Sequence, residues 1–494
     1  MFERVGTSRA FLYASDIIVP LLTWIIITFP LWMSPFHPAL VAYFIIAFDV
    51  YFLYKAFKTT YLASLTYKQI LQHYNIPFAK MLKELSGGEK LEHFFVVVAY
   101  KELLYKLEQT IDAVAHGDYP YRTIHLVLAF EVREPEEERK KKEEAIRAKY
   151  GKYFKDIIFT VHTLVAGEIP GKASNQTHAV KQLSKYIREK EMDPQHCLIT
   201  ISDADSRFPE NYFSYLTYEF LKDHGRQYHF YWAPVLLYNN FWQLPFFGRM
   251  QATLSSVLRL AFLSQKDQLI QISSYSTNLW LIEQIGYWDV DIIPEDWHVY
   301  MQAFFTFGEK VKTLPLYTII NGDAVYSGNM IKTFFSRYDQ EKRWAWGVTD
   351  IGYAMKKLFT TPHLPFWPKM KKILFLTETH LLWPSTFFIL TVSAWIPPFV
   401  NPTFKRTVLG FLLPQLTGFI LTLATAMIVV YIYLDIKMRQ KLQIQTKILN
   451  MPMLLIQWYL LPVVSFVLSS LPALEAHTRL LIGKKITYKV TEKV

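Results

Sequence analysis

Residues 197–213 read CLITISDADSRFPENYF, and this stretch decides the predicted fold. Its apolar, β-branched start is typical of a buried strand. Asp203 and Asp205 follow at the carboxyl end of that strand, where open α/β sheets bind their ligands. Two carboxylates separated by one residue can share a hard divalent cation that also bridges phosphates. D-x-D is a weak signal alone, and a solvated acidic turn is the simpler alternative.

Strand and helix patterns alternate on the amino-terminal side of this stretch. Three more apolar runs predict strands: HFFVVVAY (93–100), TIHLVLAF (123–130) and DIIFTVHTL (156–164). A helical pattern over Lys101–His116 separates the first two. This alternation predicts an α/β domain built on a largely parallel sheet.

Two acidic residues recur downstream in YWDVDIIPEDWHVYMQAF (287–304). Glu295 and Asp296 follow Pro294 and open a helical pattern. Acidic residues favour the first turn of a helix because they complement its dipole, so helix capping is the alternative to a functional role.

A third feature is the Q-x-x-R-W string formed by Gln340, Arg343 and Trp344 in YDQEKRWAWG (338–347). Arginine can bind phosphate with two parallel hydrogen bonds, and tryptophan offers an apolar face to a sugar ring. The alternative is an amphipathic helix whose aromatic residues pack at a membrane surface.

The composition indicates a folded membrane protein. Of 494 residues, 51% are hydrophobic and 19% are charged, which excludes a disordered chain. The single cysteine, Cys197, excludes a disulfide framework and a cysteine-based zinc site. The net charge of +11 would suit nucleic acid, but this apolar content favours a membrane, and we expect no nucleic-acid partner. Five apolar stretches approach or exceed the roughly 20 residues of a spanning helix: Phe11–Met33, Pro38–Phe57, Ile373–Val400, Val408–Leu434 and Met453–Leu474.

Basic residues predict the topology. Arg4 and Arg9 precede the first apolar stretch, and Lys55, Lys58 and Lys68 lie at or beyond the end of the second. The positive-inside rule therefore places the amino terminus and the α/β domain in the cytosol. The carboxyl-terminal tail is also basic, with Lys484, Lys485, Lys489 and Lys493. The basic loop before Met453 and the tail are both expected in the cytosol, and a segment that crosses the membrane once cannot join two cytosolic segments. The last apolar stretch, interrupted by Pro462 and Pro472, is therefore either re-entrant or interfacial, or one end is misplaced.

Taken in this order, D-x-D, E-D and Q-x-x-R-W resemble the membrane-integrated family 2 glycosyltransferases, which include cellulose, chitin and hyaluronan synthases. The resemblance implies a GT-A-like, Rossmann-like α/β domain inserted between transmembrane helices. It implies a layout of two transmembrane helices in 1–60, the cytosolic glycosyltransferase domain in 90–330, amphipathic interface helices in 331–372, transmembrane helices in 373–475 and a basic cytosolic tail in 476–494.

The resemblance also implies roles for individual residues. Asp203 and Asp205 would hold Mg²⁺ or Mn²⁺ against the diphosphate of a nucleotide-sugar, and Asp296, beside Glu295, would be the general base. Gln340, Arg343 and Trp344 would lie beside donor and acceptor. Tyr100, Glu102 and Lys172 would lie near the nucleotide. Glu131 stands where the family usually has an aspartate.

The implied activity is inverting transfer of a sugar from a nucleotide-sugar, a UDP-sugar in preference to a GDP-sugar, to a hydroxyl acceptor. The expected product is a β-linked polysaccharide that a processive synthase extrudes, so the acceptor is the growing glycan. The alternative is one addition to a lipid acceptor at the cytosolic leaflet, as in ceramide glucosyltransferases. Both imply a multi-pass protein in contact with the bilayer, expected in the plasma or inner membrane.

Overall fold

The computed structural model describes residues 8–444 and 450–487 and divides the chain into two compact units. We call residues 65–241 and 262–324 the sheet unit. The helical unit comprises residues 1–64, 242–261 and 325–494. Of the basic residues used to predict topology, Arg4, Lys489 and Lys493 lie outside the described residues.

A seven-stranded mixed sheet forms the centre of the sheet unit, in the order β3-β2-β1-β4-β7-β5-β8. Its strands are β1 (Glu92–Val98), β2 (Ile124–Glu131), β3 (Asp156–His162), β4 (Cys197–Asp203), β5 (His229–Trp232), β7 (Tyr275–Asn278) and β8 (Lys312–Pro315). The first four are mutually parallel, and β7 runs antiparallel to β4 and β5. The predicted parallel strands are therefore present, within a mixed α/β, GT-A-like sheet. A two-stranded ladder pairs β6 (Val235–Leu236) with β9 (Ile320–Asn321).

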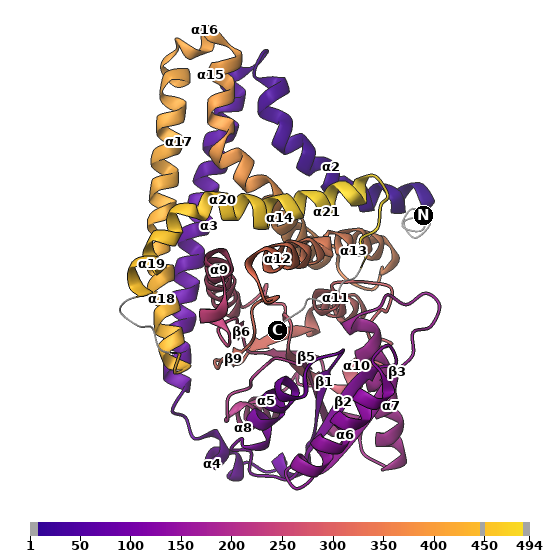
Figure 1. The fold of residues 1–494 in the computed structure, drawn as a ribbon. Helices are drawn as coiled ribbons and strands as arrows, with labels where there is room; N and C mark the ends of the chain where they lie inside the picture. Colours follow the sequence, from indigo (N-terminus) through magenta and orange to yellow (C-terminus); the bar gives the residue numbers. More distant parts are fainter. Residues whose placement is uncertain (1–7, 445–449, 488–494) are drawn as a thin grey trace. The chain divides into compact units, whose positions relative to one another are not determined.

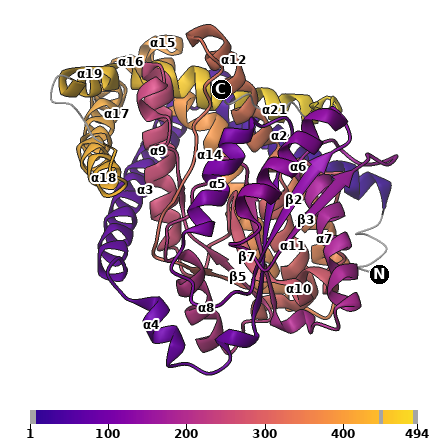
Figure 2. The ribbon, with the colours of Figure 1, turned by 60° about the horizontal axis from the view of Figure 1, so that its bottom comes forward.

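Helices cover both faces of this sheet (Figure 2). One face carries α5 (Leu104–Ala115), α6 (Glu136–Tyr150) and α8 (Tyr212–Lys222). On the other face, α7 (Lys172–Glu189) packs against β1, β2 and β3, and α10 (Leu279–Gln284) packs against β4 and β7. The smaller α4 (Phe78–Lys83) adjoins α8, and α11 (Glu295–Phe307) completes the unit.

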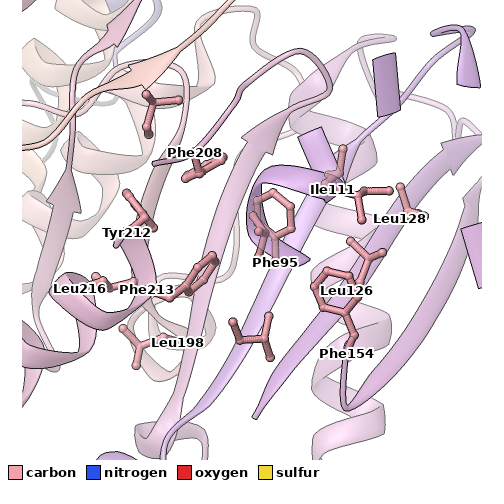
Figure 3. Packing of buried hydrophobic residues seen from close by; sticks show 14 of the residues in the cluster. Phe95, Ile111, Leu126, Leu128, Phe154, Leu198, Phe208, Tyr212, Phe213 and Leu216 are labelled. Carbon is pink, nitrogen blue, oxygen red and sulfur yellow. The ribbon is translucent and has the colours of Figure 1, made fainter. Parts of the chain in front are cut away.

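The hydrophobic core lies between the sheet and α5, α6 and α8 (Figure 3). Phe95 of β1 and Leu126 of β2 point into it and are fully buried. Phe94, the neighbour of Phe95, contacts Tyr186 of α7 on the opposite face. Burial on both faces explains why HFFVVVAY is continuously apolar, without the alternation of a half-exposed strand.

The helical unit contains most of the apolar sequence. Within residues 8–444 and 450–487, five helical stretches are long and apolar enough to cross a membrane: Ala10–Met33, Pro38–His73, Phe366–Thr391, Val408–Lys441 and Met451–Leu481. They contain α2 (Arg9–Met33), α3 (Pro38–His73), α14 (Phe366–Thr391), α17 (Val408–Ala426), α18 (Ile428–Lys441), α19 (Met451–Ile456), α20 (Leu461–Ser465) and α21 (Leu471–Leu481). The other helices of the unit are α9 (Phe246–Leu263), α12 (Met330–Ala345), α13 (Thr349–Thr360), α15 (Ile396–Val400) and α16 (Pro402–Lys405).

All apolar stretches but the first differ from the sequence-based expectation. The second and the fourth continue to His73 and Lys441, beyond the expected Phe57 and Leu434. The third ends at Thr391, before the expected Val400, because Pro397 and Pro398 start the separate helix α15. The last is a chain of short helical pieces, and Pro462 and Pro472 stand in the first turns of α20 and α21, where proline is tolerated. In the helical unit, α20 and α21 lie across the direction of α17 (Figure 1).

Candidate active site

The strand register brings the predicted nucleotide and metal residues to one edge of the sheet. Val98 at the end of β1 pairs with Ala129 of β2 and with Asp203 at the end of β4. Tyr100, Glu102 and Glu131 therefore lie at the same carboxyl edge as Asp203. Ligands bind at this edge of open α/β sheets, beside the point where strand order reverses, here between β1 and β4.

Lys172 links the two acidic motifs within the sheet unit. Its Nζ lies 2.7 Å from Oδ1 of Asp203 and 3.5 Å from Oε1 of Glu295. Burial alone would lower the pKa of Lys172, but these two carboxylates outweigh burial and hold that pKa above its usual value. Lys172 is the first residue of α7, and Asn175 in the next turn donates from Nδ2 to the carbonyl oxygen of Ala129, which ties this helix end to β2.

Glu295 and Asp296 form the first turn of α11, as the sequence predicts. The carboxylate of Asp296 accepts the backbone N–H groups of Ser273 and Trp297, each at 2.9 Å. Burial raises the pKa of Glu295 and of Asp296. The charge of Asp296 raises the pKa of Glu295 further, and the charge of Asp203 raises the pKa of Asp296. A carboxylate with a raised pKa in a buried site is suited to accept a proton.

Ser273 contacts three of these groups, and sequence analysis did not identify it. Its Oγ donates to Oδ2 of Asp203, its N–H donates to Oδ2 of Asp296, and its carbonyl oxygen accepts Nζ of Lys172 at 2.6 Å. Its φ is +70°, which is uncommon for a residue other than glycine. A serine in ISSYSTN carries no motif, so only the fold reveals its place.

A second polar group surrounds Asp205. The backbone N–H of Asp323 donates to Oδ2 of Asp205 at 3.2 Å, and the side chain of Asp323 pairs with Lys106 at 2.8 Å. Burial, together with the smaller effect of the Asp205 charge, raises the pKa of Glu102 to about 7. Lys106 and Asp323 are also residues that the sequence did not point to, because they come from α5 and from the segment after β9.

Glu131, at the end of β2, is paired with Arg133. The guanidinium of Arg133 donates from Nε to Oε2 of Glu131 at 2.7 Å and lies 4.5 Å from the centre of the Tyr100 ring. Arg133 therefore stacks on Tyr100, which the sequence analysis placed near the nucleotide. The sequence analysis did not identify Arg133 itself, although it stands only two positions after Glu131.

The Q-x-x-R-W residues belong to the helical unit, on α12, which Asn329 caps by accepting the N–H of Lys332. Arg337, one turn before Gln340, donates to the side chains of Gln251, Gln340 and Glu341. The ring of Trp344 lies 4.8 Å from the guanidinium of Arg337 and 5.8 Å from that of Arg259. Gln340 is buried, and Arg343 and Trp344 are half-buried.

The donor set suits a hard cation that is shared with phosphate. Among the described residues, no group of three His, Cys, Asp or Glu side chains could hold a metal ion by itself. Asp203 and Asp205 offer oxygen ligands only. Mg²⁺ typically binds through one or two carboxylates, water and substrate phosphates, so the two aspartates fit such an ion.

Comparison with known proteins gives one family match. Residues 198–434, just under half of the chain, match the family model described as "Glycosyl transferase family group 2". No curated protein sequence matches the chain significantly.

Two solved structures are similar at low identity. The mannosyltransferase PcManGT from Pyrobaculum calidifontis, in complex with GDP-Man and Mn²⁺, is 13% identical over 79% of this chain and 97% of that chain, with a TM-score of 0.40. TarS residues 1–349 from S. aureus is 10% identical over 71% of this chain and 92% of that chain, with a TM-score of 0.34. These scores are too low to carry an argument.

Proposed function

We propose that this enzyme, which contains a family 2 glycosyltransferase domain, moves a sugar from a nucleotide-sugar to a hydroxyl acceptor with inversion at the anomeric carbon. The observation that carries the proposal is the gathering of Lys172, Asp203, Glu295 and Asp296 around Ser273. In this proposal the half-buried carboxylate of Asp296 is the base, Lys172 faces the diphosphate, and Asp203 holds the cation that binds it.

The chain's own groups divide the work of a single displacement. Asp296 accepts the proton of the attacking hydroxyl, and the N–H groups of Ser273 and Trp297 hold its carboxylate in place. Lys172 offers positive charge beside Asp203, where the leaving diphosphate gains negative charge. Asp203 and Asp205 would hold Mg²⁺ or Mn²⁺, whose chemistry is to neutralise that diphosphate. One displacement turns an α-linked donor into a β-glycoside and needs no covalent intermediate.

We propose a membrane lipid as the acceptor and one addition per acceptor. A polymer channel would be lined by polar and aromatic side chains of the apolar helices, and several such side chains already have partners within the helical unit. The hydroxyls of Ser385, Thr417, Thr422 and Thr425 donate to carbonyl oxygens of their own helices. Trp383 donates to Ser469 at 3.0 Å. These polar groups are already satisfied, as is common for hydroxyls in membrane helices.

A processive polysaccharide synthase is the second candidate. The described residues contain five long apolar helices, which is more than anchoring the protein in a membrane requires. This number of helices favours a path through the bilayer for a growing glycan. In both cases we propose a multi-pass protein of the plasma or inner membrane with the sheet unit in the cytosol.

The test is to incubate the purified protein with UDP- and GDP-sugars, Mg²⁺ or Mn²⁺, and membrane lipids. Release of a nucleoside diphosphate identifies the donor, and we expect UDP. Product size separates a single glycolipid from a polymer. EDTA should stop release, and Mn²⁺ should restore it. Full activity in EDTA would remove the cation from the mechanism, and no release from any donor would overturn the proposed function.

A further inference from the structure

We propose that Ser273 is a positioning residue that fixes the donor-binding carboxylate of Asp203 relative to the base Asp296. This inference rests on the proposed function. Ser273 is not a catalytic residue here, because it acts through Asp203, Asp296 and Lys172.

The first argument is the distribution of its contacts. The hydroxyl of Ser273 donates to Asp203 at the end of β4, and its N–H donates to Asp296 at the start of α11. Its carbonyl oxygen accepts Nζ of Lys172 from α7. One residue thus uses all three of its polar groups on three different elements, each of which carries a predicted site residue.

The second argument is the backbone conformation. Ser273 adopts φ +70°, a left-handed conformation that is unfavourable for a side chain with a Cβ atom. Strained conformations of this kind persist where the surrounding structure holds them, and they cluster at active sites. Glycine would adopt this backbone at lower cost, so a role in shaping the loop alone would favour glycine. Serine adds a hydroxymethyl group, and the hydroxyl of that group donates to Asp203.

The segment around Ser273 is rigid enough to transmit this effect. Ser274, the next residue, is fully buried and accepts the backbone N–H of Asp203 at 3.2 Å. Gln271 is also fully buried, donates to the carbonyl oxygen of Asp296 at 3.1 Å and accepts Thr313 at 2.9 Å. Residues 271–274 therefore hold the backbone of both acidic motifs, and the Ser273 hydroxyl orients one carboxylate.

Two substitutions separate positioning from stability. Ser273→Gly removes the hydroxyl and relieves the strained backbone, and Ser273→Ala removes the hydroxyl and keeps the strain. Both should weaken binding of the nucleoside diphosphate about tenfold to a hundredfold, as expected for one hydrogen bond to a charged group. Ser273→Gly should nevertheless have the higher thermal unfolding midpoint. If Ser273 had only a structural role, the variant with the lower unfolding midpoint would also lose more nucleotide affinity.

Glu191→Gly is the matched control. Glu191 is exposed, lies just beyond the end of α7 and also has a positive φ of +55°. This variant relieves the same kind of strain away from the site, so it should keep wild-type binding and transfer.

The measurements are calorimetric titration of each variant of the full chain with UDP and with GDP in the presence of Mn²⁺, thermal unfolding, and kcat and KM for transfer. Equal losses of binding in the two Ser273 variants, despite different stabilities, support the inference. Wild-type binding by Ser273→Gly, or losses that follow the unfolding midpoints, overturn it. If the wild-type protein neither binds nor turns over nucleotide-sugars, the proposed function fails instead.

Discussion

Asp296 is the residue on which the proposed chemistry depends most. Asp296 is half-buried at the start of α11, and its carboxylate accepts two backbone N–H groups. These hydrogen bonds fix its orientation whether or not a substrate is present. Its position in a first helical turn also complements the helix dipole, which is the capping alternative.

Asp296→Asn should lower kcat by roughly 10²-fold or more, because the amide is nearly isosteric but cannot accept the proton. Binding of the nucleoside diphosphate should stay close to wild type. Steady-state kinetics together with titration calorimetry check both expectations. Asp291→Asn is the control, because it makes the same change at an exposed position five residues earlier. Wild-type turnover in Asp296→Asn would leave this residue with a capping role only.

The pH dependence of transfer provides a second test of the same residue. Burial raises the pKa of Asp296 above its ordinary value of 3.8, and the base works only when deprotonated. Turnover should therefore fall as the pH drops, with an apparent pKa above 3.8 that belongs to the Glu295–Asp296 pair. A log kcat profile checks this, and the Asp291→Asn control should leave the profile unchanged. A rate that stays flat down to the ordinary aspartate range would contradict the assignment.

At the scale of elements, α12 carries two arginines with different surroundings. Arg337 is buried and donates to Gln251, Gln340 and Glu341, so it holds α12 against α9 and orients the glutamine of the Q-x-x-R-W string. Arg343, two turns later, is half-buried. Helix α12 also packs on α21, where Tyr338 donates to Glu475 at 2.8 Å.

Arg343→Lys should severely reduce transfer while expression and the thermal unfolding midpoint stay near wild type, because an ammonium cannot reproduce the planar fork of a guanidinium. Arg337→Lys is the matched comparison on the same helix. It should destabilise the protein by about 3–5 kcal/mol, since one ammonium cannot serve three buried acceptors. Transfer assays and thermal unfolding on both variants check the contrast. Full activity in Arg343→Lys would indicate that the Q-x-x-R-W residues have a structural role only.

At the scale of the whole molecule, the open question is which helical stretches cross the bilayer. In the helical unit, α20 and α21 lie across the direction of α17 (Figure 1). α21 carries Glu475, His477 and Arg479, with Arg479 donating to Glu475 at 2.7 Å. A polar segment in this orientation suits an interfacial position, which would return the tail to the cytosolic side without a fifth span.

Single-cysteine labelling tests this topology. The native Cys197 is fully buried and burial raises the pKa of its thiol to about 12, so it should not react. His37→Cys, in the exposed loop between α2 and α3, should react with a membrane-impermeant maleimide in intact cells. Lys484→Cys, exposed after α21, should react only after the membrane is permeabilised. Labelling of Lys484→Cys in intact cells would instead make the last stretch a full span.

The sequence by itself determined the elements and the identity of the chemical groups. Continuous apolar runs such as HFFVVVAY predict strands buried on both faces, and local chemistry decides such elements. The order of D-x-D, E-D and Q-x-x-R-W indicated the enzyme class for the same reason, because each motif is contiguous along the chain.

Only the tertiary structure decided which residues meet. Lys172, Asp203, Ser273 and Asp296 come from α7, β4, the loop before β7 and α11, and no spacing along the sequence predicts their contacts. Ser273 carries no motif, so its role follows from a left-handed backbone that long-range packing holds in place. Likewise, only the structure shows that the hydroxyls of Ser385 and Thr417 donate to carbonyl oxygens of their own helices. A hydroxyl in a helix can bond to its own backbone or to a ligand, and the sequence does not distinguish the two.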